Sequence, residues 1–150
     1  MRRLQTMLFV EERLAREILP LFYEHVHATD LKYGLERHLL ETKKHAVAVR
    51  AILHDLGAEA EPVKSPVLLG LEVEHDELMK DFPTDAMHAG LIAQSEHLEI
   101  AAYTELRSTA NALGHEQVAL RLQEILEQEE YALELAEKAL AKILAERQPI

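Results

Sequence analysis

The stretch from Ser95 to Leu106, SEHLEIAAYTEL, decides how the rest of the sequence is interpreted. Residues three and four positions apart share one face of a helix. One such line consists of Ile92, Glu96, Glu99, Tyr103, Leu106 and Ala110. Two carboxylates therefore lie in line with residues that favour burial. Because an ionised carboxylate in an apolar core is costly without a cation or strong donors, either this face is exposed or something positive meets it.

A second helix, expected over residues 31–56, carries a similar interruption. Its apolar line includes His38, Glu41 and His45 at spacings of three and four, with Thr42 beside Glu41. Gly57 follows as an expected C-cap. Because a helix presents residues at these spacings as neighbours, the side chains are close enough to bind one metal ion.

The first and last helices each place one glutamate in an apolar stripe. Glu11 does so over residues 4–27, where Pro20 is expected to kink or divide the helix. Glu129 does so over residues 116–146. Glu124 and Glu127 lie on a neighbouring line of that helix, so either remains an alternative to Glu129.

The overall composition indicates one helical domain over residues 1–150. The chain is 48% hydrophobic but only 5% aromatic, and its formal net charge is −11. Such a surface repels nucleic acid and anionic lipid, so neither is expected as a partner. The chain has no cysteine, which excludes thiol chemistry and disulfides and indicates a reducing, cytoplasmic location. The apolar runs are too short to cross a membrane.

Sustained 3.6-residue periodicity predicts an all-α fold with helices near residues 4–27, 31–56, 66–80, 85–112 and 116–146. Thr29-Asp30, Ser65-Pro66 and Thr84-Asp85 supply the expected helix starts. The short helix near 66–80 would lie on a crossover between two helix pairs. His75, Asp76 and Glu77 lie on it and are interpreted as a solvated face.

Four long helices with acidic residues on apolar lines near mid-length would form a bundle with a buried cluster of carboxylates and two imidazoles. Repulsion would raise the pKa values of such carboxylates or lead the cluster to bind cations. Carboxylate and imidazole ligands suit iron, manganese or zinc, and several carboxylates need two divalent ions for charge balance. The cluster therefore predicts a di-metal site of the kind found in carboxylate helix bundles.

Three stretches resemble the YciF-like (DUF892) family of ferritin-like bacterial proteins. They are EHLEIAAYTELR at Glu96–Arg107, ALRLQEILEQEE at Ala119–Glu130 and HLLETKKH at His38–His45. The resemblance implies a ferritin-like four-helix bundle with an additional short crossover helix between helices two and three. It also implies a homodimer, a di-metal site and an association with stress, without a settled reaction.

Carried over by position, the resemblance implies a metal site drawn from Glu11, His38, Glu41, His45, Glu96, Glu99 and Glu129. The sequence departs from the family pattern in helix two, because a strict Glu-x-x-His would place histidine where Lys44 stands. It also has Leu133 where the family often has an acidic residue. The remaining histidines are interpreted as surface or structural: His25, His27, His54, His75, His88, His97 and His115. Tyr103 and Tyr131 are expected in the core, where either hydroxyl could touch a ligand.

These observations favour a non-haem protein with two divalent ions, iron first and manganese or zinc as alternatives. Oxidation of Fe(II), or reduction of peroxide or oxygen, fits such a site, so an oxidase or peroxidase activity is one expectation. Two other functions remain open. One is a metal-free structural or stress-interaction bundle with a degenerate site, and the other is a metal buffer without turnover.

Overall fold

The structure is a computed structural model that describes residues 1–146, so the last four residues of the predicted 1–150 domain lie outside it. Its elements are α1 (Arg2–Arg13), η1 (Leu14–Ile18), α2 (Leu19–His25), α3 (Thr29–Asp55), α4 (Pro66–Asp81), α5 (Asp85–Ala112) and α6 (Glu116–Glu146). No strand occurs among the described residues, which confirms the all-α prediction. None of these helices combines the length and the apolar character needed to span a membrane.

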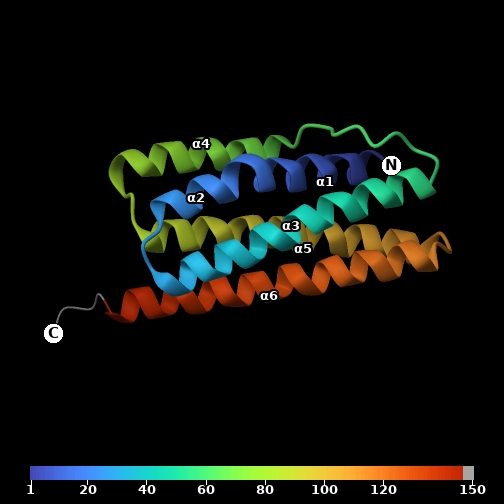
Figure 1. Ribbon diagram of the computed structural model, residues 1–150. Helices are drawn as coiled ribbons and strands as arrows, with labels where there is room; N and C mark the ends of the chain where they lie inside the picture. The colour runs from blue at the N-terminus through green and yellow to red at the C-terminus, as the bar shows by residue number, and fades with distance from the viewer. Residues whose placement is uncertain (147–150) are drawn as a thin grey trace.

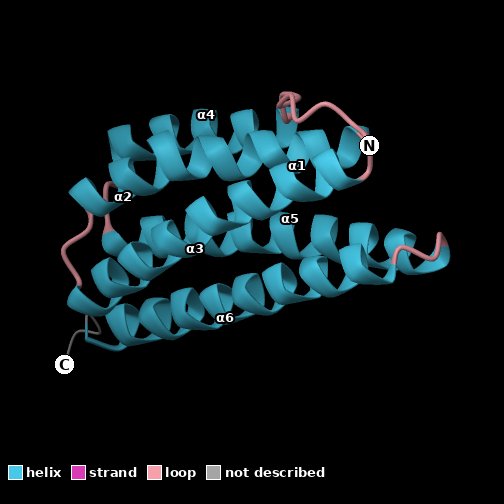
Figure 2. Ribbon diagram, turned by 45° about the vertical axis from the view of Figure 1, so that its right-hand side comes forward, coloured by secondary structure: helices cyan, strands magenta, loops and turns pink. Residues whose placement is uncertain are grey.

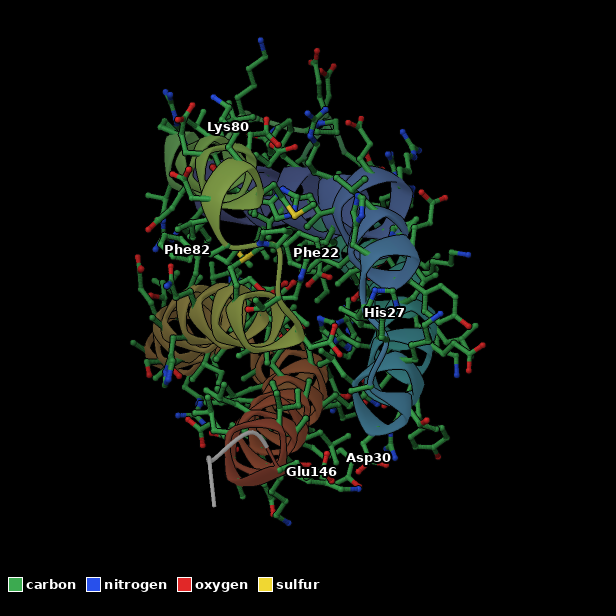
Figure 3. The ribbon with its side chains drawn as sticks, turned by 90° about the vertical axis from the view of Figure 1, so that its left-hand side faces the viewer. Phe22, His27, Asp30, Lys80, Phe82 and Glu146 are labelled. Carbon is green, nitrogen blue, oxygen red and sulfur yellow. The ribbon has the colours of Figure 1, made fainter. Side chains whose placement is uncertain are left out.

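The long helices form a four-helix bundle. The first member is the continuous rod of α1, η1 and α2, and the others are α3, α5 and α6 (Figure 1). Viewed from one end, these four surround a common core, and α4 lies outside it beside the first rod and α5 (Figure 3). An extended loop connects α3 to α4 along the outside of the bundle (Figure 2). The predicted crossover helix between helices two and three is thus confirmed as α4.

The first rod changes its helical geometry just before Pro20. Residues Leu14–Ile18 form a five-residue π-helix, and Pro20 lies in the first turn of α2. Proline has no N–H, and its ring clashes with the carbonyl four residues earlier. The wider turn of η1 accommodates both effects without ending the rod. Pro20 was expected to kink or divide the helix, and the structure shows a π-helical segment at this place.

Side-chain caps fix where α4 and α5 begin. The Ser65 hydroxyl accepts a hydrogen bond from the Leu68 N–H at 3.3 Å, and the Thr84 hydroxyl accepts one from Met87 at 3.1 Å. Each satisfies one of the free N–H groups at a helix N-terminus. Both predicted helix starts are therefore confirmed.

The start of α3 is held differently from the predicted Thr29-Asp30 cap. Its N-cap is Ala28, which has no capping side chain, and Thr29 is already helical. The buried carboxylate of Asp85 instead accepts hydrogen bonds from the backbone N–H groups of His27 at 3.0 Å and Ala28 at 2.7 Å. This contact ties the first turn of α5 to the connection between α2 and α3. The prediction that Thr29-Asp30 caps α3 was therefore wrong.

We predict that Gly114→Ala destabilises the protein by about 1–2 kcal/mol, because Gly114 ends α5 with a left-handed φ of +77°. The matched control is Gly90→Ala within α5, where an added Cβ meets no atom within 4 Å. That change should stabilise the helix by about 0.5–1 kcal/mol. Urea unfolding of both variants measures the difference, and equal effects would contradict this account of the α5 terminus.

Candidate metal centre

Six titratable side chains from four helices meet in the middle of the bundle. Each of them is at most 3% exposed. They are Glu11 from α1, His38 and His45 from α3, Glu96 and Glu99 from α5, and Glu129 from α6. The apolar lines that carry these residues face the core, so the structure brings together six of the seven positions in the predicted site.

The six side chains form two overlapping groups, each able to offer its ligand atoms to one metal ion. One group contains His38, Glu96, Glu99 and Glu129, and the other contains Glu11, His45 and Glu129. Within each group one ligand atom per residue lies within 4.8 Å of the others. Glu129 belongs to both groups, and its two carboxylate oxygens face different histidines. Glu129 could therefore offer a ligand atom to either group.

Short distances join the histidines to the carboxylates. His38 Nε2 lies 2.8 Å from Glu96 Oε1, and His45 Nδ1 lies 2.8 Å from Glu129 Oε1. The angles do not align these contacts as hydrogen bonds, so both nitrogens and all four oxygens of Glu96 and Glu129 lack a hydrogen-bond partner. Both oxygens of Glu99 lack one as well. Buried polar atoms are rarely left unpaired, so this concentration of donor atoms without hydrogen bonds could hold a cation.

Burial and mutual repulsion govern the protonation of the cluster without metal. Burial raises the pKa of Glu99 well above its ordinary value, and repulsion from Glu129 and Glu11 raises it further. Burial opposes the protonation of His38, but attraction to Glu96 outweighs it and raises the pKa of His38 to about 9. Burial also opposes ionisation of Glu129, but contact with His45 outweighs it and lowers the pKa of Glu129. Without metal, His38 and Glu99 therefore keep protons that balance part of the negative charge of the cluster.

Two neighbouring side chains orient the ligands from outside the cluster. The Tyr103 hydroxyl donates a hydrogen bond to Glu11 Oε1. The Gln128 side-chain oxygen lies 2.6 Å from His45 Nε2, so this nitrogen carries the hydrogen when the ring is neutral. His45 then presents the lone pair of Nδ1 to Glu11 and Glu129. Such outer hydrogen bonds are typical of metal-binding histidines. The prediction that Tyr103 lies in the core, with a hydroxyl able to touch a ligand, agrees with this position.

Glu41 is the one predicted site residue that the structure does not bring into the cluster. Its carboxylate lies outside, 3.0 Å from the Arg37 guanidinium one turn earlier on α3. Thr42 takes the inward position between His38 and His45, fully buried and with no partner for its hydroxyl. Both positions 41 and 42 lie three or four residues from each histidine, so periodicity alone does not separate them.

Of the three candidate glutamates on α6, the structure places one in the cluster. Glu129 is buried in the cluster, whereas Glu124 and Glu127 are exposed and do not replace it. Tyr131, expected in the core, is instead 40% exposed. Its ring lies under the Arg37 guanidinium at 4.4 Å from the centroid, which makes this face of α6 a polar surface.

The donor set has the chemistry of a site for divalent metal ions. Glu11, Glu96, Glu99 and Glu129 carry four negative charges when ionised, and the two imidazoles are neutral when they bind metal. Two divalent ions would balance this charge. Oxygen and imidazole donors without a thiolate suit iron, manganese or zinc. The buried cluster could therefore hold metal, with Glu129 common to both positions.

Comparison with known proteins places the chain in a family. The family described as "Domain of unknown function (DUF892)" matches residues 1–148. The chain belongs to the DUF892 family. This confirms the resemblance seen in the three sequence stretches. Among curated proteins, none matches the chain.

Solved structures share the fold over most of their length. YcfI from Rhodopseudomonas palustris is 28% identical with a TM-score of 0.86, covering 91% of this chain and 88% of that one. The E. coli stress protein YciF is 22% identical with a TM-score of 0.89, covering 97% and 94%. A protein from Xanthomonas campestris is 24% identical with a TM-score of 0.72, covering 97% and 94%. These matches confirm the ferritin-like bundle with its crossover helix.

We predict that the metal-free protein loses stability as pH rises from about 5 to 9. In the folded protein Glu99 keeps its proton above pH 4.5, whereas in the unfolded chain it has lost it. The contribution of Glu99 to the free energy of unfolding therefore falls as pH rises. His38, with its pKa raised from 6.5 to about 9, adds stability below pH 6.5 that is lost as pH rises through 9. Each proton changes the free energy of unfolding by up to about 1.4 kcal/mol per pH unit.

Chemical denaturation in the presence of a chelator measures this slope. Glu99→Gln should flatten the slope above about pH 5, because glutamine cannot ionise. The control Glu105→Gln, on the exposed face of α5, should leave it unchanged. A wild-type stability that is constant or rises over this range would contradict the assigned protonation of the cluster.

Proposed function

We propose that this DUF892 protein binds two divalent metal ions between α1, α3, α5 and α6, with iron as the first candidate and manganese or zinc as alternatives. The observation that carries the proposal is the position of Glu129, which is shared by two buried groups of potential ligands. His38, Glu96 and Glu99 would complete one ion's protein ligands. Glu11 and His45 would complete the other's. Glu41, which pairs with Arg37, is left out of this ligand set.

The residues of the chain would position and isolate the ions. Four helices hold the ligands with almost no exposed surface, which excludes bulk water and strengthens electrostatic attraction. Tyr103 and Gln128 orient Glu11 and His45 from outside. Iron or manganese, when bound, would supply the redox chemistry that oxidation of Fe(II) or reduction of peroxide or oxygen requires.

The space beside the centre favours a very small substrate. A cavity of about 20 Å³ reaches His38 between α3, α5 and α6, and its other walls include Leu35, Ile92 and Ala136. Such a volume holds about one water-sized molecule. Oxygen and peroxide are substrates of about this size. The similarity to a structure named as a stress protein in E. coli agrees with a role in handling iron or peroxide under stress.

Homodimer formation remains part of the proposal. Three large side chains on the outer face of α3, Tyr33, Leu40 and Val47, are each more than 60% exposed and lie seven residues apart. This spacing lines them up on one helix face. A second copy of the chain that packs on α3 would cover this stripe without approaching the buried ligands.

We predict that the protein, loaded anaerobically with Fe(II) or Mn(II), binds about two ions per chain, as in other di-metal carboxylate bundles. Glu129→Gln should weaken both positions by about 10–100-fold or more, the range found when groups around a metal are removed. Glu41→Gln on α3 is the control and should bind as wild type does. Equilibrium dialysis with metal analysis measures both. Absence of binding to wild type, or equal losses in the two variants, would contradict the proposal.

A further inference from the structure

A second cluster of histidines lies outside the carboxylate centre, at the end of the bundle where α4 meets α5. His75 of α4 and His88 of α5 are buried, and their Nε2 atoms lie 3.4 Å apart. The Phe22 ring stacks on His75 with 4.7 Å between centroids and meets His88 edge-on at 5.2 Å. Figure 3 looks along the bundle from this end and labels Phe22 of the first rod, near α4 and α5. His88 precedes Glu96 by eight residues, which is about 12 Å along the helix.

The partners of the other ring nitrogens fix where the lone pairs point. His88 Nδ1 lies 2.9 Å from the Thr84 carbonyl oxygen, which only accepts hydrogen bonds, so Nδ1 carries the hydrogen. His75 Nδ1 lies 3.4 Å from the carboxylate of Asp76, a longer contact that favours the same arrangement. When both neutral rings carry their hydrogen on Nδ1, the two Nε2 lone pairs face each other. Two buried lone pairs at this distance need a proton or a metal cation between them.

Geometry favours a metal over a shared proton. Two nitrogens bound to one tetrahedral ion at 2.0–2.1 Å lie about 3.3–3.4 Å apart, which agrees with the observed 3.4 Å between the two Nε2 atoms. Hydrogen bonds that nitrogen donates to oxygen usually span about 2.7–3.2 Å, so 3.4 Å is long for two nitrogens that share a proton.

We propose that His75 and His88 bind a late first-row divalent cation, with zinc as the committed candidate, and that the ion cross-links α4 to α5. Imidazole nitrogen is a preferred zinc ligand, and a backbone carbonyl that fixes the opposite nitrogen is the usual outer support. The site is independent of the carboxylate centre, because the two clusters share no residue.

Space for further ligands lies on the His75 side of the pair. His75, Phe22 and Asp76 line a cavity of about 200 Å³ between the first rod, α4 and α5, which can hold several waters, whereas His88 is not part of its lining. A third imidazole, the exposed His25 at the end of α2, stacks against His88 with 6.0 Å between centroids. If His25 also joined the ion, three segments of the chain would be tied together at this end of the bundle.

The consequence would be local and structural. The N-terminal half of α4 is anchored by the buried Leu68 and by an ion pair between Glu72 and Arg13 at 2.9 Å. His75 is the one fully buried side chain in the second half of this helix. An ion on His75 and His88 would therefore hold the half of α4 that has little other buried surface.

Zinc titration of the full chain tests the proposal. Isothermal calorimetry with metal analysis should show that His88→Gln binds about one zinc fewer than wild type, or binds that zinc at least tenfold more weakly. His75→Gln should give the same loss, so the test survives if one variant does not fold. The matched control is His97→Gln, an exposed histidine on α5, which should bind as wild type does.

A second measurement locates the ion and separates this site from the carboxylate centre. Nitrogen NMR of the histidine rings should show zinc shifting the Nε2 resonances of His75 and His88 in both wild type and Glu129→Gln. If Glu129→Gln abolishes this shift together with binding at the centre, the independent site is refuted. Unchanged zinc binding in His75→Gln and His88→Gln, or ring resonances of a proton-sharing pair that zinc does not move, would also overturn the proposal.

Discussion

Negative charge in the middle of the bundle is the constraint on which the rest of this structure depends. Glu11, Glu96, Glu99 and Glu129 are fully buried, and ionised carboxylates in such surroundings are strongly unfavourable without compensation. The two imidazoles of the cluster supply at most two positive charges. Two negative charges then remain, and either protonation of two of the carboxyl groups, Glu99 first among them, or binding of cations must balance them. Each helix of the bundle contributes to this balance, so the site and the fold cannot be considered separately.

The architecture keeps the ligands in place with elements that lie outside them. The first rod continues past Glu11 through a π-helix, a feature often found at functional sites. Asp85 fastens the start of α5 to the turn before α3, and Tyr103 and Gln128 hold Glu11 and His45. The ligands therefore come from regular helices whose ends and neighbours are fixed, which is the arrangement that precise metal binding requires.

The sequence predicts the buried glutamates because each interrupts an apolar line with large aliphatic residues on both sides. Glu96 and Glu99 share such a line with Ile92 and Leu106, and the helical period leaves one inward face for them. Position 41 could not be separated from 42 in this way. Both satisfy the spacing to His38 and His45. In the structure Thr42 lies inward, and Glu41 lies outside beside Arg37.

The pair of His75 and His88 shows a different limit. Each histidine lies on a different helix, and His75 has the exposed Asp76 and Glu77 beside it, so local patterning predicts a solvated face for His75. That prediction was correct for the two acids and wrong for His75, which is buried. The contact between the two rings depends on how the crossover helix packs on α5. The spacing of residues within a single helix does not predict how two helices pack on each other.

The most direct test of the central claim compares Glu96→Gln/Glu99→Gln with wild type in thermal melts, once with chelator and once with Fe(II) or Mn(II). Glutamine keeps the shape of the side chain but removes its charge. Without metal, the double variant should be at least as stable as wild type. With metal, wild type should gain about 2.7 kcal/mol at a hundredfold excess over the dissociation constant, and the variant should gain much less. Parallel metal-induced shifts in the two proteins would contradict the account.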